Sequence, residues 1–296
     1  HIMYLWLDAL TNYLTAAGYP DTECGDYKTF WPASVHVVGK DILRFHAVYW
    51  PAFLMAAGLA PPKRIFAHGW WTVEGQKMSK TLRNVVEPFQ LVDTYGLDQV
   101  RYFLLREVPF GNDGDFSSAA LVNRVNSELA NDFGNLAQRV LSMINRNCEA
   151  AVPAPGALSE DDTDMLGRAQ GLLAAVRAQM DAQALSDTLE TIWAVVRAAN
   201  AYTDHQAPWA LRKTDPERMG TVLYVLAEVI RHLAILTQPF VPTAAGRLLD
   251  QLAVAPDARD FAALGAALTA GTVLPKPEGV FPRIVEDATE DRAEAS

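Results

Sequence analysis

Two lysines and a serine stand within four residues, at Lys77-Met78-Ser79-Lys80. They follow a predicted strand that ends at His68-Gly69, and they predict a short loop. Two ammonium groups and a hydroxyl on such a loop could close over a polyphosphate. There they would stabilise the charge that builds on pyrophosphate when a nucleotide is attacked at its α-phosphorus. For an isolated sequence of this kind, an exposed lysine-rich turn is the alternative.

The elements before this loop predict a β-α-β unit. Residues 34–38 (Ser-Val-His-Val-Val) are typical of a buried strand, Asp41 is placed to cap a helix over about 42–57, and residues 64–68 predict a second strand. A crossover of this kind pairs its strands in parallel. Ligands bind at the carboxyl ends of such strands. We therefore expect one rim to carry the residues that follow the strands, which are Gly39, Asp41, His68, Gly69 and Trp71.

The rest of the chain predicts helices. Glu87-Pro88 opens a short predicted helix, and another covers 97–105. A turn at 112–115 then leads to a long helix, capped by Asp115 or Ser117, that ends near Asn147. Apolar residues at three- and four-residue spacing then predict a helix bundle with short loops. Its segments cover about 159–180, 185–203, 215–237 and 241–254. The last stretch, 271–285, is rich in Pro and Gly and predicts an extended strap anchored by Phe281.

Composition narrows the class of protein. The 296 residues suggest about two domains, and half of them are apolar. We find no run of about 18 apolar residues and no signal peptide, so we expect no membrane span. Cys24 and Cys148 are distant, without a Cys-x-x-Cys pair, which argues against zinc and fits reduced thiols in the cytoplasm. The net charge of −10 disfavours a general polyanion binder but allows recognition of specific RNA bases.

Several segments resemble one family in the order in which they occur. The lysine sequence resembles the second signature of class I aminoacyl-tRNA synthetases. Over residues 1 to about 285 the chain resembles the methionyl-tRNA synthetase family, on Tyr4-Leu-Trp-Leu-Asp-Ala-Leu-Thr-Asn-Tyr13, Gly39-Lys-Asp-Ile-Leu-Arg-Phe-His46, Asn135-Leu-Ala-Gln-Arg139 and Gln206-Ala-Pro-Trp209. The family's His-x-Gly-His-type motif and its inserted connective domain do not occur here. We therefore interpret the chain as the family's C-terminal part.

The resemblance implies an α/β fold followed by an all-α domain. Residues 1–115 would form the second half of a Rossmann-like parallel-sheet catalytic domain, together with a connecting piece that contacts the tRNA stem. Residues 116–285 would form a helix-bundle anticodon-binding domain. Residues 286–296, with five carboxylates and one arginine, would form a disordered acidic tail.

The resemblance also assigns a methionine pocket. One wall would carry Trp6, Ala9, Leu10 and Tyr13, and the other Asp41, Ile42, Phe45 and His46. Aromatic edges suit the polarisable sulfur of methionine. His46 would orient Tyr13. Leu10 stands where the family usually has proline. Spacing alone would also fit an ordinary helix core.

For the nucleotide, the resemblance implies that Gly39, Asp41, His68, Gly69, Trp71 and Lys80 bind ATP. Lys77, Ser79 and Lys80 would be the catalytic set, with Lys80 nearest the developing charge. Mg²⁺ would accompany ATP, and we expect no structural zinc. Arg83 stands where a glycine is usual, which would strain a left-handed backbone there.

For the tRNA, the resemblance places Asn135, Arg139, Pro208 and Trp209 around the CAU anticodon. Asn135 and Arg139 are four residues apart and share a helix face. Trp209, restricted by the preceding proline, could stack on an unpaired base. The alternatives are a solvated helix face for the first two and a core position for Trp209.

These observations predict an ATP-dependent methionine–tRNA ligase whose partners are methionine, ATP and tRNA(Met). We expect a cytoplasmic monomer, because no dimerisation or oligonucleotide-binding domain follows residue 285. We also expect no activity from the chain alone. Two alternatives stay open: a non-catalytic tRNA-binding module, and a class I synthetase for Val, Ile, Leu or Cys.

Overall fold

A computed structural model describes residues 5–73, 75–78 and 84–285. Its contacts divide the chain into two compact units, His1–Arg83 with Phe110–Asp115, and Asn84–Pro109 with Phe116–Ser296. Ser79, Lys80, Arg83 and the acidic tail lie outside the described residues.

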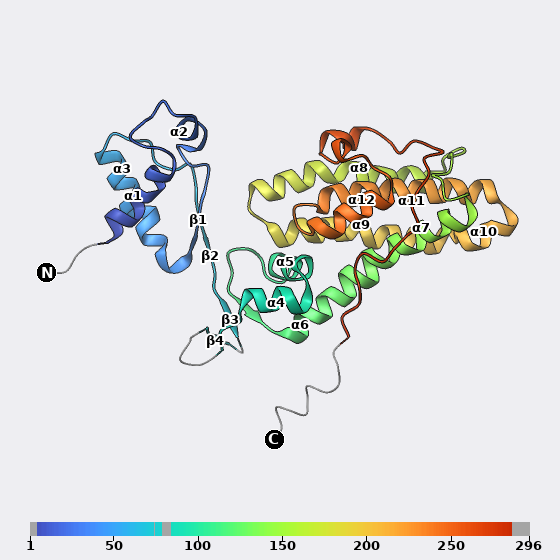
Figure 1. Ribbon diagram of the computed structural model, residues 1–296, viewed down its shortest axis with the longest axis horizontal. Coiled ribbons are helices and arrows are strands. Elements are labelled where there is room, and N and C mark those ends of the chain that lie inside the picture. Colours follow the sequence, from blue (N-terminus) through green and yellow to red (C-terminus); the bar gives the residue numbers. More distant parts are fainter. Residues whose placement is uncertain (1–4, 74, 79–83, 286–296) are drawn as a thin grey trace, which may run out of the picture. The chain divides into compact units, whose positions relative to one another are not determined.

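The first unit is built around a parallel strand pair. Strands β1 (His36–Gly39) and β2 (Ile65–His68) pair in parallel, with His36 opposite Ile65 and Gly39 opposite His68. This confirms the predicted crossover and brings the residues after both strands to one rim. The same unit contains three helices, α1 (Trp6–Ala16), α2 (Gly25–Phe30) and α3 (Trp50–Ala56) (Figure 1). Their buried core contains Leu10, Leu14, Ala17, Trp31, Trp50 and Leu54.

The predicted single helix over 42–57 consists of three successive parts. A 3-10 turn (Lys40–Ile42) leads to a π-helical turn (Phe45–Tyr49) and then to α3. Asp41 lies inside the 3-10 turn and does not cap it, because Gly39 occupies the N-cap position. The expectation of an Asp41 cap was therefore wrong. The carboxylate of Asp41 instead accepts a hydrogen bond from the indole Nε1 of Trp70 at 3.4 Å.

A second small sheet replaces two predicted irregular segments. Strands β3 (Trp71–Val73) and β4 (Gln76–Lys77) form an antiparallel hairpin, and β5 (Gly114–Phe116) completes the order β4-β3-β5. Lys77 thus lies in a strand, not in the predicted loop, and residues 114–115 belong to a strand, not to the predicted turn. Strands of two or three residues are too short for alternation to reveal them.

The second unit is helical. Ser117 caps α6 by accepting from the amide of Ala120, which confirms one of the two predicted caps. From there, helix α6, a π-helical segment (Val125–Gly134) and α7 continue to Asn147, as predicted. The helices of this unit are α4 (Pro88–Tyr95), α5 (Leu97–Arg106), α6 (Ser118–Arg124), α7 (Asn135–Asn147), α8 (Glu160–Asp181), α9 (Leu185–Gln206), α10 (Pro208–Thr214), α11 (Pro216–Thr237) and α12 (Pro242–Gln251).

Helix α11 is the centre of this bundle. It packs against α7, α8, α9, α10 and α12 (Figure 1). By length and composition it is apolar enough to cross a membrane, although it contains no uninterrupted apolar run of about 18 residues. However, 94% of its most apolar 18-residue window is buried inside the bundle. Its hydropathy is accounted for by this core position.

Helices α4 and α5 belong with the bundle. Tyr102 of α5 donates to Glu128 at 2.5 Å, and Arg106 pairs with the same carboxylate at 3.2 Å. Asp98, 5% exposed, accepts the amide of Ala244 in the first turn of α12 at 2.6 Å. These buried polar contacts tie residues 84–109 to the helical unit, whereas the expected domain boundary groups them with the sheet.

The C-terminal strap runs over the bundle in extended form, as predicted. Phe281 is 6% exposed, and its ring centroid lies 6.0 Å from that of Phe133 in the π-helical segment. The side chain of Asn126 donates to the carbonyl of Ile284 at 2.9 Å and accepts from its amide at 2.8 Å. Phe281 therefore anchors the strap.

Candidate functional site

Aromatic side chains from α1 and from the segment after β1 form a cluster. The rings of Trp6 and Phe45 stack at 3.9 Å between centroids, with 9° between their planes. The ring of His46 meets Trp6 edge-on at 6.3 Å and Tyr13 edge-on at 5.7 Å. The structure thus brings together four of the residues predicted for the methionine pocket.

Two hydrogen bonds hold the ring of His46. Its Nδ1 lies 3.0 Å from the carbonyl oxygen of Ile42, which can only accept, so Nδ1 carries the proton. In the neutral ring, Nε2 accepts from the hydroxyl of Tyr13 at 2.8 Å. Burial raises the pKa of Tyr13, which keeps this donor protonated at neutral pH. This hydrogen bond joins the Tyr13 hydroxyl to His46, and the orientation role of His46 stays a prediction.

The other predicted pocket residues lie in different settings. Leu10 is 1% exposed and packs in the core of the unit. Ala9 is exposed on α1, and Ile42 is half-buried beside His46.

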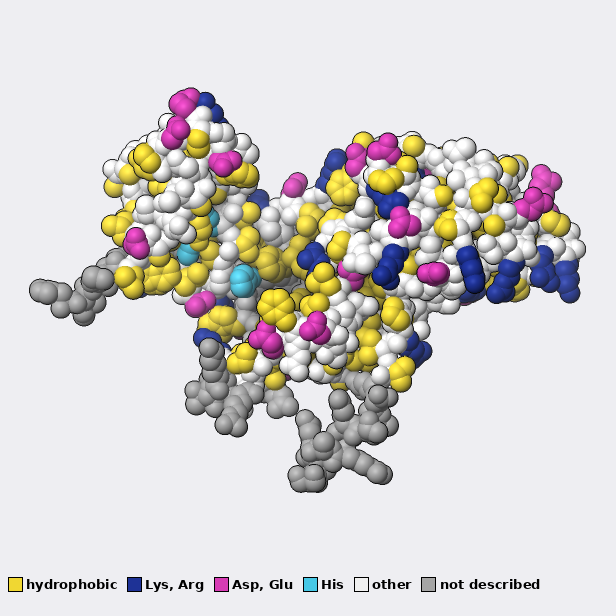
Figure 2. All heavy atoms as spheres, viewed as in Figure 1, with side chains coloured by type: hydrophobic (Ala, Val, Ile, Leu, Met, Phe, Trp, Pro, Cys, Tyr) yellow, Lys and Arg dark blue, Asp and Glu magenta, His cyan; other side chains and the backbone are white. Residues whose placement is uncertain are grey.

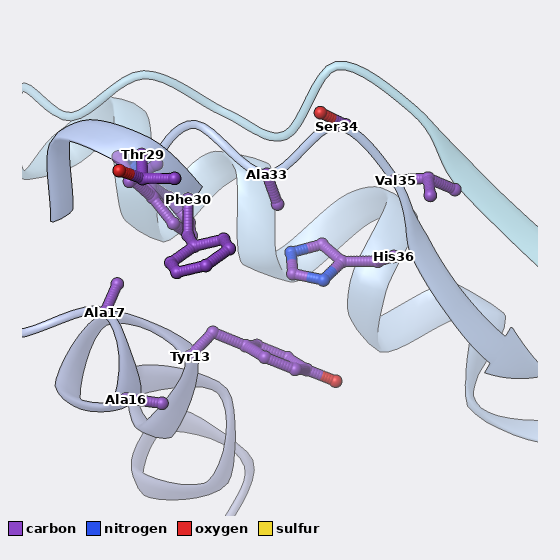
Figure 3. Close-up of a pocket in the computed structure, with 10 residues that line it drawn as sticks. Tyr13, Ala16, Ala17, Thr29, Phe30, Ala33, Ser34, Val35 and His36 are labelled. Atoms are coloured by element: carbon purple, nitrogen blue, oxygen red, sulfur yellow. The ribbon is translucent and has the colours of Figure 1, made fainter. Parts of the chain in front are cut away.

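A cavity of about 420 Å³ adjoins the aromatic cluster. Tyr13 and His36 lie on one side of it, with Phe30, Ala16 and Ala17 around the rest (Figure 3). The rings of Tyr13 and His36 are 4.3 Å apart. Burial, and then the neighbouring His46, lower the pKa of His36. Of the predicted methionine set, Tyr13 alone lines this cavity, so the cavity and the aromatic cluster are adjacent features.

The strand-end rim carries a concentration of charge around Trp70. The ammonium groups of Lys40 and Lys77 lie 4.4 Å and 4.5 Å from the centre of its ring. Both distances are within the range of cation–π attraction. Asp41 accepts from the same indole, and Asp113 binds Lys40 with both carboxylate oxygens, at 2.7 Å and 2.5 Å.

The remaining rim residues are close by in the chain. His68 hydrogen-bonds the carbonyl of Gly69 through Nδ1 at 2.9 Å, and its ring stacks on Phe110 at 6.0 Å. Trp71, predicted to contact ATP, is half-buried in β3. Sequence reasoning missed Trp70, Lys40 and Asp113. Trp70 is adjacent to Trp71 and Lys40 to Asp41, so proximity in sequence could have suggested both. No local signal connects Asp113 to the rim.

In the helical unit, Arg139 of α7 and Trp209 of α10 come together. The guanidinium lies 5.4 Å from the centre of the indole ring and pairs with Asp204 at 2.8 Å. Trp209 is 49% exposed, which excludes the core position considered as the alternative. Pro208 beneath it is buried, and Asn135 is exposed one helical turn before Arg139.

Basic side chains gather at this end of the bundle. Lys and Arg cluster on the face near α10, the helix whose last turn holds Arg212 and Lys213 (Figure 2). These cations occur in a chain of net charge −10. Within the described ranges, no group of three or more His, Cys, Asp and Glu side chains is arranged to hold a metal ion.

Two family models match the chain. Residues 1–141 match the class I tRNA synthetases of the methionine group, and residues 152–295 match the anticodon-binding domain of methionyl-tRNA ligase. The fold is that of part of a class I aminoacyl-tRNA synthetase followed by its helical anticodon-binding domain. Within that class, the chain belongs to the methionyl-tRNA synthetase family.

Individual relatives agree. A methionine–tRNA ligase of Brucella suis is 60% identical over 97% of this chain, and one of Mycobacterium tuberculosis is 55% identical over 96%. The structure of the M. tuberculosis methionyl-tRNA synthetase in complex with methionyl-adenylate matches with a TM-score of 0.93 at 54% identity over 96% of this chain. The chain spans 56% of the length of the B. suis relative and of the chain in that structure.

Proposed function

We propose that this chain supplies part of the active site and the anticodon-binding domain of a methionine–tRNA ligase. By the complete enzyme we mean a protein that contains this chain together with the remaining portion found in its longer relatives. A methionine carboxylate oxygen attacks the α-phosphorus of ATP, and the bond to pyrophosphate breaks. A ribose hydroxyl of the terminal adenosine of tRNA(Met) then attacks the carbonyl carbon of methionyl-adenylate, and AMP leaves.

One observation carries this proposal. The aromatic cluster and the charged rim occur on one short stretch of chain, because Asp41 and His46 are five residues apart in the segment after β1. The stacked Trp6–Phe45 pair and the edge of Tyr13 offer an apolar, polarisable surface for a thioether side chain. The adjacent rim offers Asp41 to the polar groups of the substrate or to the ribose. A pocket of this design favours methionine over Val, Ile and Leu.

The lysines stabilise negative charge on the leaving group. Lys77, on β4 beside Trp70, and Lys80, outside the described residues, stabilise the departing pyrophosphate, with Ser79 in support. No protein nucleophile is needed, because positioning and charge stabilisation lower the barrier. Gly39, His68, Gly69 and Trp71 contribute to the ATP site, and Mg²⁺ binds with the substrate phosphates.

The helical unit reads the tRNA. Trp209 stacks on an anticodon base while Arg139 and Asn135 bind its neighbours. This role is supported by the exposure of Trp209, by Arg139 against its ring and by the basic last turn of α10. We place the protein in the cytoplasm, where Cys24 and Cys148, both free thiols, stay reduced.

Methionine-dependent exchange of pyrophosphate into ATP by the complete enzyme tests the first step, and charging of tRNA(Met) tests the second. Absence of both with methionine, or equal exchange with isoleucine, would reject the proposal.

A further inference from the structure

Asp113 joins β5 to the rim. Besides binding Lys40 with both oxygens, it accepts the backbone amide of Trp70 at 2.8 Å. The hydrogen bond from Lys40, followed by that from Trp70, lowers the pKa of Asp113, so the carboxylate is charged at neutral pH. One side chain thus fixes both the backbone of Trp70 and the ammonium group above its ring.

Asp115, two residues further on, holds the hairpin itself. It accepts the hydroxyl of Thr72 in β3 at 2.7 Å and the amide of Gly75 at 2.9 Å. Gly75 has a φ of +72°, a left-handed conformation that suits the turn between β3 and β4. Asp115 therefore binds the hairpin at its strand and at its turn, and Lys77 follows that turn by two residues.

The backbone between these contacts is also close-packed. A Cβ atom at Gly69 would lie 2.2 Å from the carbonyl oxygen of Asn112, so this approach requires glycine. The amide of Gly114 donates to the carbonyl of Trp70 at 2.8 Å. The segment Asn112-Asp-Gly-Asp115 therefore contacts the rim and the hairpin along its length.

The position of Lys77 depends on the same contacts. Two ammonium groups on one indole repel each other, and Asp113 offsets the charge of Lys40. The Trp70 ring is then available to attract Lys77, with Asp41 fixing the ring edge.

We propose that Asp113 and Asp115 form a clasp that positions the β3–β4 hairpin, and with it Lys77, for the activation step. Both are positioning residues, acting through Trp70 and Gly75 and not on the substrate. This inference rests on the proposed function for its consequence, but the clasp itself can be tested on the chain alone.

The first test measures amide hydrogen exchange in the 296-residue chain. Asp115→Ala, which removes the acceptor, should speed exchange of the amides over residues 71–78 on the order of tenfold, because charge-assisted hydrogen bonds to that segment are lost. Asp115→Asn retains an acceptor oxygen and should give an intermediate value. Asp26→Asn is the matched control, because Asp26 is an exposed carboxylate in α2 of the same unit. It should leave the exchange rates of these amides unchanged. Unchanged protection of the hairpin in Asp115→Ala would overturn the clasp.

The second test uses methionine-dependent pyrophosphate exchange in the complete enzyme. Asp115→Ala and Asp113→Ala should lower kcat about tenfold or more with little change in the KM for methionine, because Lys77 acts on the departing charge. Trp70→Tyr, which keeps the aromatic face, should retain more activity than Trp70→Leu. A faster-exchanging hairpin with parental kcat would refute the positioning role. An inactive parent enzyme would instead reject the proposed function and leave the exchange result intact.

Discussion

Replacing Trp209 by alanine should impair tRNA charging and leave the fold intact. About half of the side chain is exposed, so its truncation leaves no core cavity, and the unfolding free energy should change by roughly 1 kcal/mol or less. A lost base–aromatic stack costs about 1–3 kcal/mol, which corresponds to a roughly 5- to 150-fold lower kcat/KM for tRNA(Met). Trp209→Phe should recover most of this loss.

The assay compares aminoacylation of tRNA(Met) with tRNA-free pyrophosphate exchange in the complete enzyme, and the latter should be unaffected. Phe261→Ala is the matched control, because Phe261 is also an exposed ring of the helical unit with an arginine above it, Arg177 at 5.7 Å. A folded Trp209→Ala variant that charges tRNA(Met) like the parent would refute the stacking role. So would an equal loss in Phe261→Ala.

Three further predictions concern activation and stability. Purified residues 1–296 should form no methionyl-adenylate at an enzymatic rate, and robust methionine-dependent pyrophosphate exchange by this chain would contradict that. In the complete enzyme, Lys80→Ala should slow pre-steady-state adenylation about a hundredfold, roughly 3 kcal/mol, with little loss of methionine affinity, whereas weakened binding at an unchanged rate would contradict its role. Burial raises the pKa of Asp162, but hydrogen bonds from Arg218 and Tyr202 outweigh it and lower the pKa from 3.8 to about 2. Since the folded value is the lower one, this stabilisation is present above pH 3.8 and is lost towards pH 2. The gap in urea-unfolding free energy between parent and Asp162→Asn should narrow by about 2 kcal/mol over that range, while the gap for the exposed Asp164→Asn should hardly change.

The parts of the fold that were predicted correctly have strong local signals. The valine-rich segment before Gly39 and the crossover that follows it predict the parallel pair, and the three- and four-residue spacing of apolar side chains predicts the bundle. The π-helical segment Val125–Gly134 was not foreseen, because its apolar spacing differs little from that of an α-helix. Helix α10 was missed because seven residues carry little periodicity.

The site could be predicted only where residues are close in sequence or match a family motif. Trp6, Tyr13, Phe45 and His46 were selected by resemblance, and the structure shows them in contact, although their role in binding methionine remains a prediction. The partners of Trp70 and Thr72 are more than 40 residues away, at Asp113 and Asp115. Contacts at such separations leave no trace in local spacing, so the same segment was taken for a simple turn.

The central claim is that the aromatic cluster beside the charged rim selects methionine for activation. The most direct measurement is ATP–pyrophosphate exchange by the complete enzyme with methionine, valine, isoleucine, leucine and cysteine offered separately. We predict exchange with methionine and a kcat/KM at least about a hundredfold lower for each of the others, since apolar pockets discriminate by about 1–3 kcal/mol and the Tyr13–His46 pair adds to this. Equal or greater exchange with any of the other four amino acids would contradict it.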